Sequence, residues 1–459
     1  MASSLRDRIG GGMTGYWQKK TGMAEYLRLY MREDKWLAWE DQPADPNDPS
    51  SRTIPGAKNK VGETLRNAFN STNVIFLLGS GASFSAVNSS GRGQAPGMAT
   101  LWKAVRDKID KETLNNGQSF DDIAEELLGM SPPKPEEKSA GNIEKLLSLC
   151  KMKLELLSVK ATDEQFEQLD SEVSVLTDFI SKAETAILNE VGFVDEKTSL
   201  PAHSNLLRKF SKRSAEKPRV KLFTTNYDLC LEEAGARLGV VLIDGFSHSA
   251  EQRFNRDYFQ TDIVRRSSSG TKSDYIDSVF HLYKMHGSVD WRRRSDGAVI
   301  RRAKGEGNDL TPVLIYPRST KYQEAFETPY LDMFAAFQSA LREPDTTIFV
   351  AGFGFADDHI SSPIWSAVES NLSLKLVLVD PGFIEEQKLD AIQPDHALKA
   401  EEFLPNKYQL KLMRLIQQGD NRLTVLNGRF EDLVDAIPSV SGETDRQRLL
   451  MRLEDLGGV

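Results

Sequence analysis

The sequence predicts an α/β fold: a Rossmann-like, mostly parallel sheet with helices on both faces and an inserted helical subdomain. The first observation behind this prediction is that short apolar runs alternate with helix-like segments along the chain, which is typical of parallel sheets. The second is that several of these runs end in glycine or polar residues, as strands do beside a ligand crevice. The third is a charged, helix-periodic stretch at 118–192 that interrupts the strand pattern.

The strands and helices follow from local periodicity and turn residues. The first buried strand is predicted at 74–78, five apolar residues between Ser71-Thr72-Asn73 and a glycine turn. Further strands are predicted at 219–225, 240–243, 279–286, 313–316, 346–351, 374–380 and 423–426. Helices are predicted at 61–69, 98–109, 227–238, 329–341, 359–371, 408–418 and 430–436.

Three regions flank or interrupt this pattern. Residues 1–70 are predicted to be an N-terminal extension, with a short helix at 26–31 and a proline-punctuated, irregular segment at 41–50. The main domain is predicted to span 71–437, and 438–459 to be a polar tail. Two apolar stripes within 118–192 predict an antiparallel helix pair. This insertion completes the core, or else builds one wall of a cleft or an oligomer contact.

Composition excludes several classes of protein. A net charge of −9 gives no general attraction to nucleic acid or anionic membranes. No apolar run is long enough for a transmembrane helix, and no apolar segment follows the N-terminus as in a secretory signal. The two cysteines, Cys150 and Cys230, supply neither a four-thiolate zinc site nor a disulfide framework, and no metal is predicted. We therefore expect a soluble cytoplasmic protein.

The polar and glycine-rich strand ends are expected to meet at one crevice beyond the carboxyl edge of the sheet. They are Gly79-Ser80-Gly81-Ala82-Ser83, Thr224-Thr225-Asn226-Tyr227-Asp228, His286-Gly287-Ser288, residues 352–359 and Asp380-Pro381. Glycines allow a ligand to approach the backbone, and amides near a helix start favour phosphate. Each stretch alone also suits an ordinary turn or helix cap. Together they predict a nucleotide-type site.

The same residues carry a family resemblance. Residues 79–83, Thr225-Asn226-Tyr227-Asp228 and His286-Gly287 resemble, in that order, the three signature motifs of sirtuins. The pattern Tyr316-Pro317, Lys321, Thr328-Pro329-Tyr330 and then 352–360 looks more specifically like the sirtuin-like NAD hydrolase domains of bacterial anti-phage systems. The resemblance spans about residues 71–430, apart from the helical insertion.

Two departures from the sirtuin pattern bear on the reaction. Two cysteines do not supply the four-cysteine zinc module of protein-deacylating sirtuins, and their G-I-P-x-F-R segment is absent after Ser83. Water is therefore favoured over acyl-lysine as the acceptor. The resemblance implies an NAD+ glycohydrolase that releases nicotinamide and ADP-ribose, or a cyclic form, and acts in anti-phage defence by depleting NAD. The alternatives are an NAD-dependent deacylase or ADP-ribosyl transferase, and a non-catalytic subunit that senses NAD or ADP-ribose.

The resemblance also implies roles for individual residues. Asn226 would hold the nicotinamide ribose and place the attacking water, and His286 would act on a ribose hydroxyl as acceptor or general base. Asp228 would orient ribose or carboxamide. The remaining NAD-binding residues would be Gly79, Ser80, Gly81, Ala82, Ser83, Thr225, Gly352, Phe353, Gly354 and Asp380. A homo-oligomer and a HerA-type ATPase partner are implied as well.

Two further stretches are assigned ordinary roles. Residues 291–302 place a Ser-Asp-Gly turn between two arginine-rich arms, which predicts a β-hairpin with an exposed basic face. We call this segment the basic hairpin. A solvated face or subunit contact is its default role, and contact with nucleic acid or a phage protein is the alternative. Asp357 and His359 lie at a predicted helix start, where they suit a cap and have no third ligand for a metal.

Overall fold

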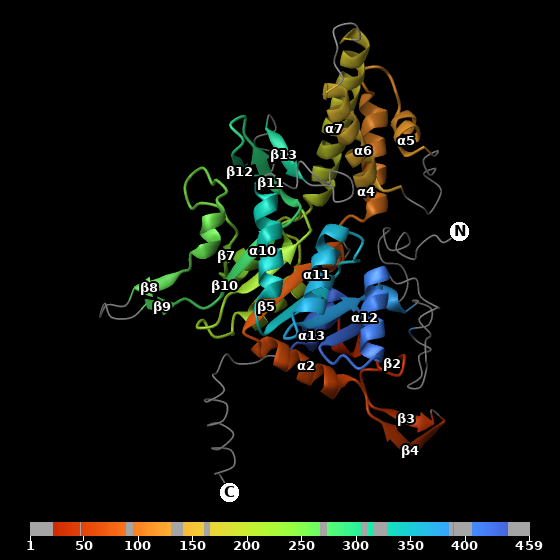
Figure 1. The fold of residues 1–459 in the computed structure, drawn as a ribbon, viewed down its shortest axis with the longest axis vertical. Coiled ribbons are helices and arrows are strands. Elements are labelled where there is room, and N and C mark those ends of the chain that lie inside the picture. Colours follow the sequence, from red (N-terminus) through yellow and green to blue (C-terminus); the bar gives the residue numbers. More distant parts are fainter. Residues whose placement is uncertain are drawn as a thin grey trace.

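A computed structural model describes residues 22–45, 47–88, 95–129, 141–159, 166–266, 273–303, 306, 310–314, 328–384, 389 and 406–438. A central sheet flanked by helices forms the body of the molecule, and a group of long helices projects from one end (Figure 1). Within the described residues, no helix has both the length and the apolar character needed to cross a membrane.

The central sheet has nine strands in the order β2-β1-β16-β15-β14-β5-β6-β10-β7. The run from β16 to β7 is parallel throughout. Its strands are β5 (Asn73–Leu78), β6 (Val220–Thr224), β7 (Val241–Ile243), β10 (Val279–Lys284), β14 (Thr346–Ala351), β15 (Lys375–Asp380) and β16 (Leu423–Asn427). The predicted Rossmann-like α/β fold is confirmed.

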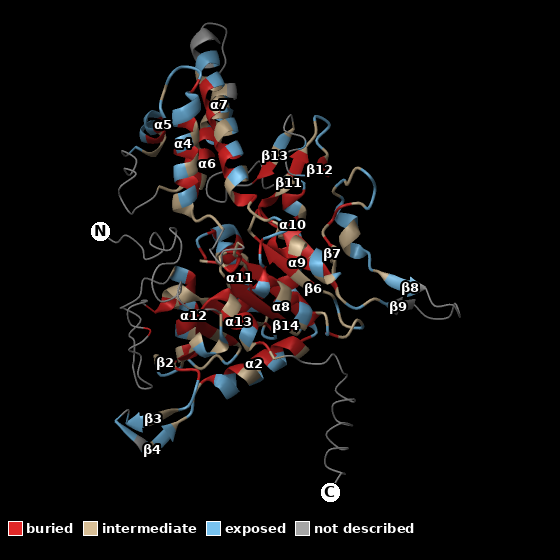
Figure 2. Cartoon of the chain, turned by 180° about the vertical axis from the view of Figure 1, so that it is seen from behind, coloured by how far each residue is buried: buried red, intermediate tan, exposed pale blue. Residues whose placement is uncertain are grey.

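Helices bury both faces of this sheet, so successive strand residues enter two different cores. In β5, Ile75 and Leu77 join one core, whereas Phe76 joins the other, where its ring stacks on Phe349 with centroids 4.6 Å apart. Figure 2 shows the buried residues concentrated in the central strands. The first core is covered by α10 (Tyr330–Arg342), α11 (Asp358–Ser370) and α12 (Lys407–Gln417). The second is covered by α2 (Lys58–Asn70), α8 (Pro201–Phe210), α9 (Cys230–Leu238) and α13 (Phe430–Ala436).

The strand order reverses between β5 and β14. The chain passes from β5 to β6 on one side, and later returns to β14 on the other side of β5. In open α/β sheets, ligands bind outside the carboxyl ends of the strands at such a reversal. Leu78 and Ala351, the last residues of these two strands, are register partners. The topology therefore predicts that a ligand binds beyond the ends of these two strands, where the two glycine turns lie.

The N-terminal region differs from its prediction in two places. The helix predicted at 26–31 is wrong: a 3-10 turn, η1 (Ala24–Tyr26), leads into β1 (Arg28–Met31), which pairs with β2 (Lys35–Leu37) and with β16. Leu29 and Tyr30 point into opposite cores, which is strand behaviour. This region therefore contributes two antiparallel strands to the main sheet.

The segment predicted to be irregular at 41–50 instead begins a hairpin of β3 (Gln42–Asp45) and β4 (Asp48–Ile54). Proline is compatible with a two-stranded ribbon because each strand has one edge that pairs with no other strand. The hairpin projects away from the main sheet (Figure 1).

The projecting helices have a core of their own. They are α4 (Met98–Glu112), α5 (Phe120–Leu128), α6 (Ile143–Val159) and α7 (Phe166–Val191). In that core Phe120 packs edge-on to Trp102 at 5.0 Å between ring centroids. The predicted pair corresponds to α6 and α7, and the unit also includes α4, before residue 118. Tyr227, next to Asn226, is buried in this same core, so the helical unit abuts the predicted site.

The remaining strands are peripheral. They are β8 (Val264–Arg266), β9 (Ser273–Tyr275), β11 (Gly287–Arg293), β12 (Val299–Arg301) and β13 (Thr311–Leu314). The last three form a small sheet in the order β12-β11-β13. Motif residues Tyr316, Pro317 and Lys321, and the predicted tail after Pro438, lie outside the described residues.

Candidate functional site

The register of the sheet brings the predicted strand ends to one edge. Leu78, Thr224 and Lys284 are successive partners across β5, β6 and β10. On the other side of β5, Ala351 pairs with Leu78, and β15 continues the row to Asp380. Residues far apart in the sequence therefore lie within a few strand spacings of one another, each about 4.8 Å.

The two glycine turns interlock backbone to backbone. Gly81 N donates to Gly352 O at 3.0 Å. A Cβ atom on Gly79 would lie 2.5 Å from Gly352 O, and one on Gly352 would lie 2.3 Å from Ala82 N. On their Cβ side these glycines are covered by the neighbouring turn, so the expected approach of a ligand to their backbone remains a prediction for their other side. Helix α3 (Ser80–Ser83) is a single turn and offers little dipole for phosphate.

Gly352 tests this interlock. Its φ of +65° already disfavours a side chain, by about 1–2 kcal/mol. Gly239 has a similar φ of +68° but nothing within 4 Å of its Cβ position. We therefore expect Gly352→Ala to lower the free energy of unfolding, measured by denaturant titration, by clearly more than Gly239→Ala. Equal losses for the two variants would show that the close contact between the turns carries no energy.

Asn226 is the first residue in a chain of side-chain hydrogen bonds. Its Nδ2 donates to Gly79 O at 2.9 Å and to Ser83 Oγ at 2.7 Å. Ser83 Oγ in turn donates to Asp228 Oδ2 at 2.5 Å, and the other Asp228 oxygen accepts from Cys230 N at 3.0 Å. Both amide hydrogens are thus engaged, which leaves Asn226 Oδ1 as the side-chain atom that can accept a further hydrogen bond. Helix α9 begins at Cys230, so Asn226 is not its cap.

Backbone contacts hold the same loop against β5. Thr225 N donates to Leu78 O at 3.1 Å, and Thr224 Oγ1 donates to the same oxygen at 2.9 Å. The backbone of Thr225 is therefore tied to the end of β5, and this contact helps to fix the position of the next residue, Asn226.

A buried lysine supports this loop from beneath. Lys284 is 1% exposed, and its Nζ donates to the carbonyl oxygens of Tyr227 and Asp228 and to Glu232 Oε1, the last at 2.9 Å. Burial raises the pKa of the Glu232 carboxyl, against the opposing effect of the Lys284 ammonium. The sequence analysis missed Lys284. The available signal was a lone cation in an apolar strand two residues before His286.

His286 follows Lys284 by two residues, just beyond the end of β10. It is 4% exposed, and its Nε2 is 3.2 Å from Asp357 Oδ2. Its ring centroid is 6.5 Å from that of Tyr227, the neighbour of Asn226. The structure thus brings the second and third motifs together. Asp357 accepts from His359 N at 2.9 Å and is the N-cap of α11, as predicted.

Phe353 and Asp380 have structural partners. Phe353 is 6% exposed and packs beside Phe355 in the core, so its side chain is not presented to a ligand. Asp380 accepts from Gly382 N at 2.7 Å and from Gln409 Nε2 at 3.1 Å, which anchors α12 to the end of β15. Gly354 lies between Phe353 and Phe355 in the turn after β14.

Residues 220–393 match a family model described as a SIR2-like domain. This part of the chain is similar to sirtuins. The matched residues include Asn226, Asp228, His286 and the turn after β14, whereas the first glycine turn lies outside the match and joins it through the sheet. The similarity supports a sirtuin-like, NAD-related function. No curated protein matches the chain.

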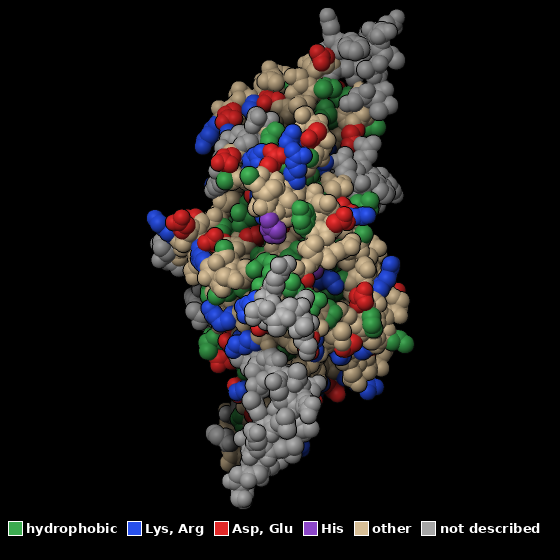
Figure 3. Space-filling model, turned by 90° about the vertical axis from the view of Figure 1, so that its left-hand side faces the viewer, with side chains coloured by type: hydrophobic (Ala, Val, Ile, Leu, Met, Phe, Trp, Pro, Cys, Tyr) green, Lys and Arg blue, Asp and Glu red, His purple; other side chains and the backbone are tan. Residues whose placement is uncertain are grey.

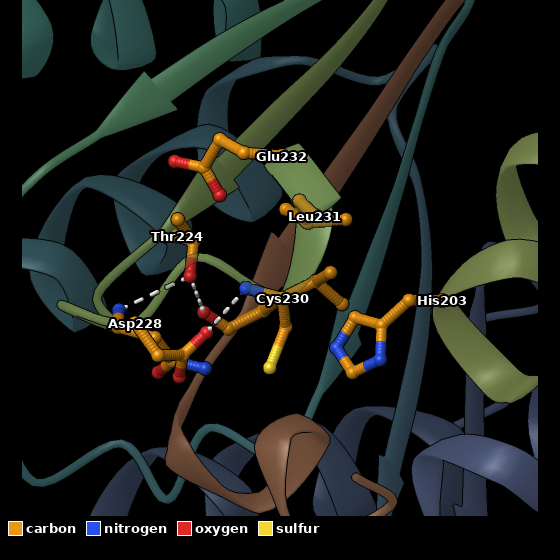
Figure 4. A pocket seen from close by; sticks show the side chains of 8 residues that line it. His203, Thr224, Asp228, Cys230, Leu231 and Glu232 are labelled. Atoms are coloured by element: carbon orange, nitrogen blue, oxygen red, sulfur yellow. Dashed lines mark hydrogen bonds between the residues drawn. The ribbon is translucent and has the colours of Figure 1, made fainter. Parts of the chain in front are cut away.

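A small pocket lies between the end of β6, the loop that follows it and the start of α9. It is lined by Leu78, His203, Thr224, Asn226, Asp228, Cys230, Leu231 and Glu232. Figure 4 shows the imidazole of His203 beside Cys230, on the side of the pocket away from Glu232. Burial raises the pKa of the Cys230 thiol, so it stays protonated and unreactive. Across the described residues, no group of three or more His, Cys, Asp or Glu could hold a metal ion.

His203 makes stability depend on pH. Burial lowers the pKa of its imidazole from 6.5 to about 4, against the opposing effect of Asp228. The unfolded chain therefore binds this proton more readily than the folded chain. The contribution of His203 to the free energy of unfolding is fully present above about pH 6.5 and is lost as the pH falls toward 4. The contribution of this one group is about 3 kcal/mol.

Denaturant unfolding between pH 7 and pH 4.5 measures this loss of stability. We expect His203→Gln to reduce the pH dependence, to which His281 contributes as well because burial also lowers its pKa to about 4. His248→Gln, at an exposed position, should leave the pH dependence unchanged. A slope that His203→Gln does not alter would refute the assignment.

The basic hairpin forms as predicted, with β11 and β12 antiparallel, but its exposed basic face does not. Arg301 pairs with Asp244 at 2.7 Å and with Asp290 at 2.9 Å, and Arg302 pairs with Glu251 at 3.0 Å. Hydrogen bonds from arginines lower the pKa of Glu251 to about 2. On the face drawn in Figure 3, positive and negative side chains are interspersed. The structure thus gives nucleic-acid contact at the hairpin no support.

Proposed function

We propose that the chain is an NAD+ glycohydrolase that releases nicotinamide and ADP-ribose or a cyclic form. One observation carries this proposal. The Asp228–Ser83–Asn226 hydrogen-bond chain lies at the strand-order reversal, where an α/β sheet binds dinucleotides, and belongs with His286 to one sheet edge. Similarity to SIR2-like domains supports NAD as the nucleotide.

The residues suit the chemistry of this cleavage. The C–N bond between nicotinamide and ribose breaks, and its electron pair leaves with nicotinamide. Positive charge develops on the ribose, and fixed polar groups and the Asp228 carboxylate would stabilise it. A water oxygen then bonds to the ribose carbon, and the water's proton passes to a base. In this proposal Asn226 Oδ1 accepts a hydrogen bond from that water, and His286 is the base.

We also propose a biological role and a means of control for this activity. A hydrolase of this kind would act in anti-phage defence by depleting NAD in the infected cell. Such an activity must be gated, and we propose that self-association or a partner, such as a HerA-type ATPase, switches it on. The helical unit around Tyr227 is suited to transmit such a signal because its core reaches the loop that carries Asn226.

Product analysis tests the proposed reaction. The full chain is incubated with NAD+, alone and together with the products of neighbouring genes, and nicotinamide is quantified by chromatography. We expect stoichiometric nicotinamide and ADP-ribose, or its cyclic form, without any added acceptor. Nicotinamide release that requires an acyl-lysine peptide would instead identify a deacylase, and NAD binding without turnover under all conditions would identify a sensing subunit.

A further inference from the structure

We propose that Asp357 is the positioning residue for His286: its carboxylate holds the imidazole as the Nε2–H tautomer and leaves Nδ1 as the proton-accepting nitrogen. The contact is a separation of 3.2 Å between Asp357 Oδ2 and His286 Nε2. Both residues are buried, at 6% and 4% exposure. The assignment of Nδ1 as a catalytic base rests on the proposed function, whereas the hold on the tautomer does not.

The position of Asp357 is set independently of His286. Its Oδ1 accepts from His359 N at 2.9 Å and so caps α11, a helix of 13 residues. The positive end of that helix dipole stabilises a negative charge at the cap. The preceding turn is held by Asn406 Nδ2, which donates to Phe355 O at 2.7 Å. One carboxylate oxygen thus anchors the residue, and the other is left to accept from the imidazole.

The tautomer follows from the hydrogen-bonding capacity of the two groups. An ionised carboxylate only accepts hydrogen bonds, so the facing Nε2 must carry hydrogen. A neutral imidazole has one N–H, which leaves the lone pair on Nδ1. Among the described residues Nδ1 makes no hydrogen bond, so it is available to a ligand hydroxyl or water. When Nδ1 accepts a proton, the imidazolium is stabilised by the adjacent carboxylate.

One substitution separates the two roles of Asp357, which are to cap α11 and to accept a hydrogen bond from His286. In Asp357→Asn the side-chain oxygen still caps α11, because asparagine is as good an N-cap as aspartate. The amide NH2, however, now faces Nε2 and donates to it, which favours the Nδ1–H tautomer. Asp358→Asn is the matched control, because its exposed carboxylate bonds Lys407 and Tyr408 instead of His286.

Nitrogen NMR of the full chain with labelled histidine reads the tautomer directly, and His286→Gln identifies its signals among the six histidines. We expect the Nε2–H form in the parent and in Asp358→Asn, and the Nδ1–H form in Asp357→Asn. Should Asp357→Asn not fold, Asp357→Ser keeps the cap and removes the carboxylate, and a mixture of the two tautomers is then expected. A parent in the Nδ1–H form, or a tautomer insensitive to Asp357, overturns the inference.

Nicotinamide release provides the second measurement. In catalytic triads the wrong tautomer costs about 10⁴-fold in rate, and we expect Asp357→Asn to slow release by about 10²-fold or more. An altered tautomer with an unchanged rate would overturn Nδ1 as the base. A parent that releases no nicotinamide would contradict the proposed function, while the NMR result would still decide whether Asp357 holds the ring.

Discussion

Asn226→Ala is expected to slow nicotinamide release from NAD+ by about 10²–10³-fold, the loss typical when one fixed polar group at a reacting centre is removed. The variant removes the oxygen proposed to hold the attacking water. It also removes the donor to Ser83, so the Ser83–Asp228 pair loses its link to the site. Initial rates of nicotinamide release at saturating NAD+ measure the effect.

Asn116→Ala is the control for this experiment, since Asn116 is exposed and hydrogen-bonds to Gln118 within its own turn. Its rate should equal that of the parent. Thermal unfolding of both variants separates catalysis from folding, because the Asn226 amide also bonds Gly79 O. A folded Asn226→Ala protein with the parent's rate would remove Asn226 from the mechanism.

Lys284→Met is expected to lower the free energy of unfolding by about 3–5 kcal/mol, the cost of breaking a buried ion pair by removing one partner. The change leaves Glu232 largely buried without its cation and deprives two loop carbonyls of their donor. Denaturant titration measures it. Because the same carbonyls belong to Tyr227 and Asp228, the loop that holds Asn226 should loosen as well.

Two further variants test this explanation. Lys58→Met is the surface control, because Lys58 and its partner Glu40 are both more than half exposed, and it should change stability by less than about 0.5 kcal/mol. Combining Lys284→Met with Glu232→Leu removes the stranded carboxyl and should recover part of the loss. If Lys284→Met alone is as stable as the parent, the ammonium does not support the loop.

Sequence periodicity was sufficient to predict the parallel strands of the central sheet, because each of them is a short apolar run whose side chains are buried in the two cores. The edge of the sheet was harder to predict. Leu27, Leu29 and Tyr30 suit a helix or a strand locally, and pairing of β1 with β2 and with β16, almost 400 residues later, selects the strand. Local composition also misjudged the basic hairpin, because the acids that neutralise its arginines come from residues 244, 251 and 290.

In the candidate site, too, some residues could be predicted from the local sequence and others depend on distant contacts. The motifs identified Asn226, Asp228 and His286 because unusual polar residues follow buried strands. The partners of these residues were harder to predict: Lys284 is a lone cation in an apolar strand, and Asp357 looks like a helix cap. The contacts Lys284–Glu232 and His286–Asp357 join residues 52 and 71 positions apart, and only the tertiary fold brings these residues together. The close packing of Gly79 on Gly352 was hidden in the same way.

A crystal structure of the chain with a non-hydrolysable NAD analogue would show whether Asn226 and His286 act on the same ribose. We expect the dinucleotide to lie across the carboxyl ends of β5 and β14, with Asn226 Oδ1 and His286 Nδ1 both within hydrogen-bonding distance of the nicotinamide ribose or of one water on it. An analogue bound elsewhere, or a ribose that only one of the two side chains reaches, would contradict this expectation.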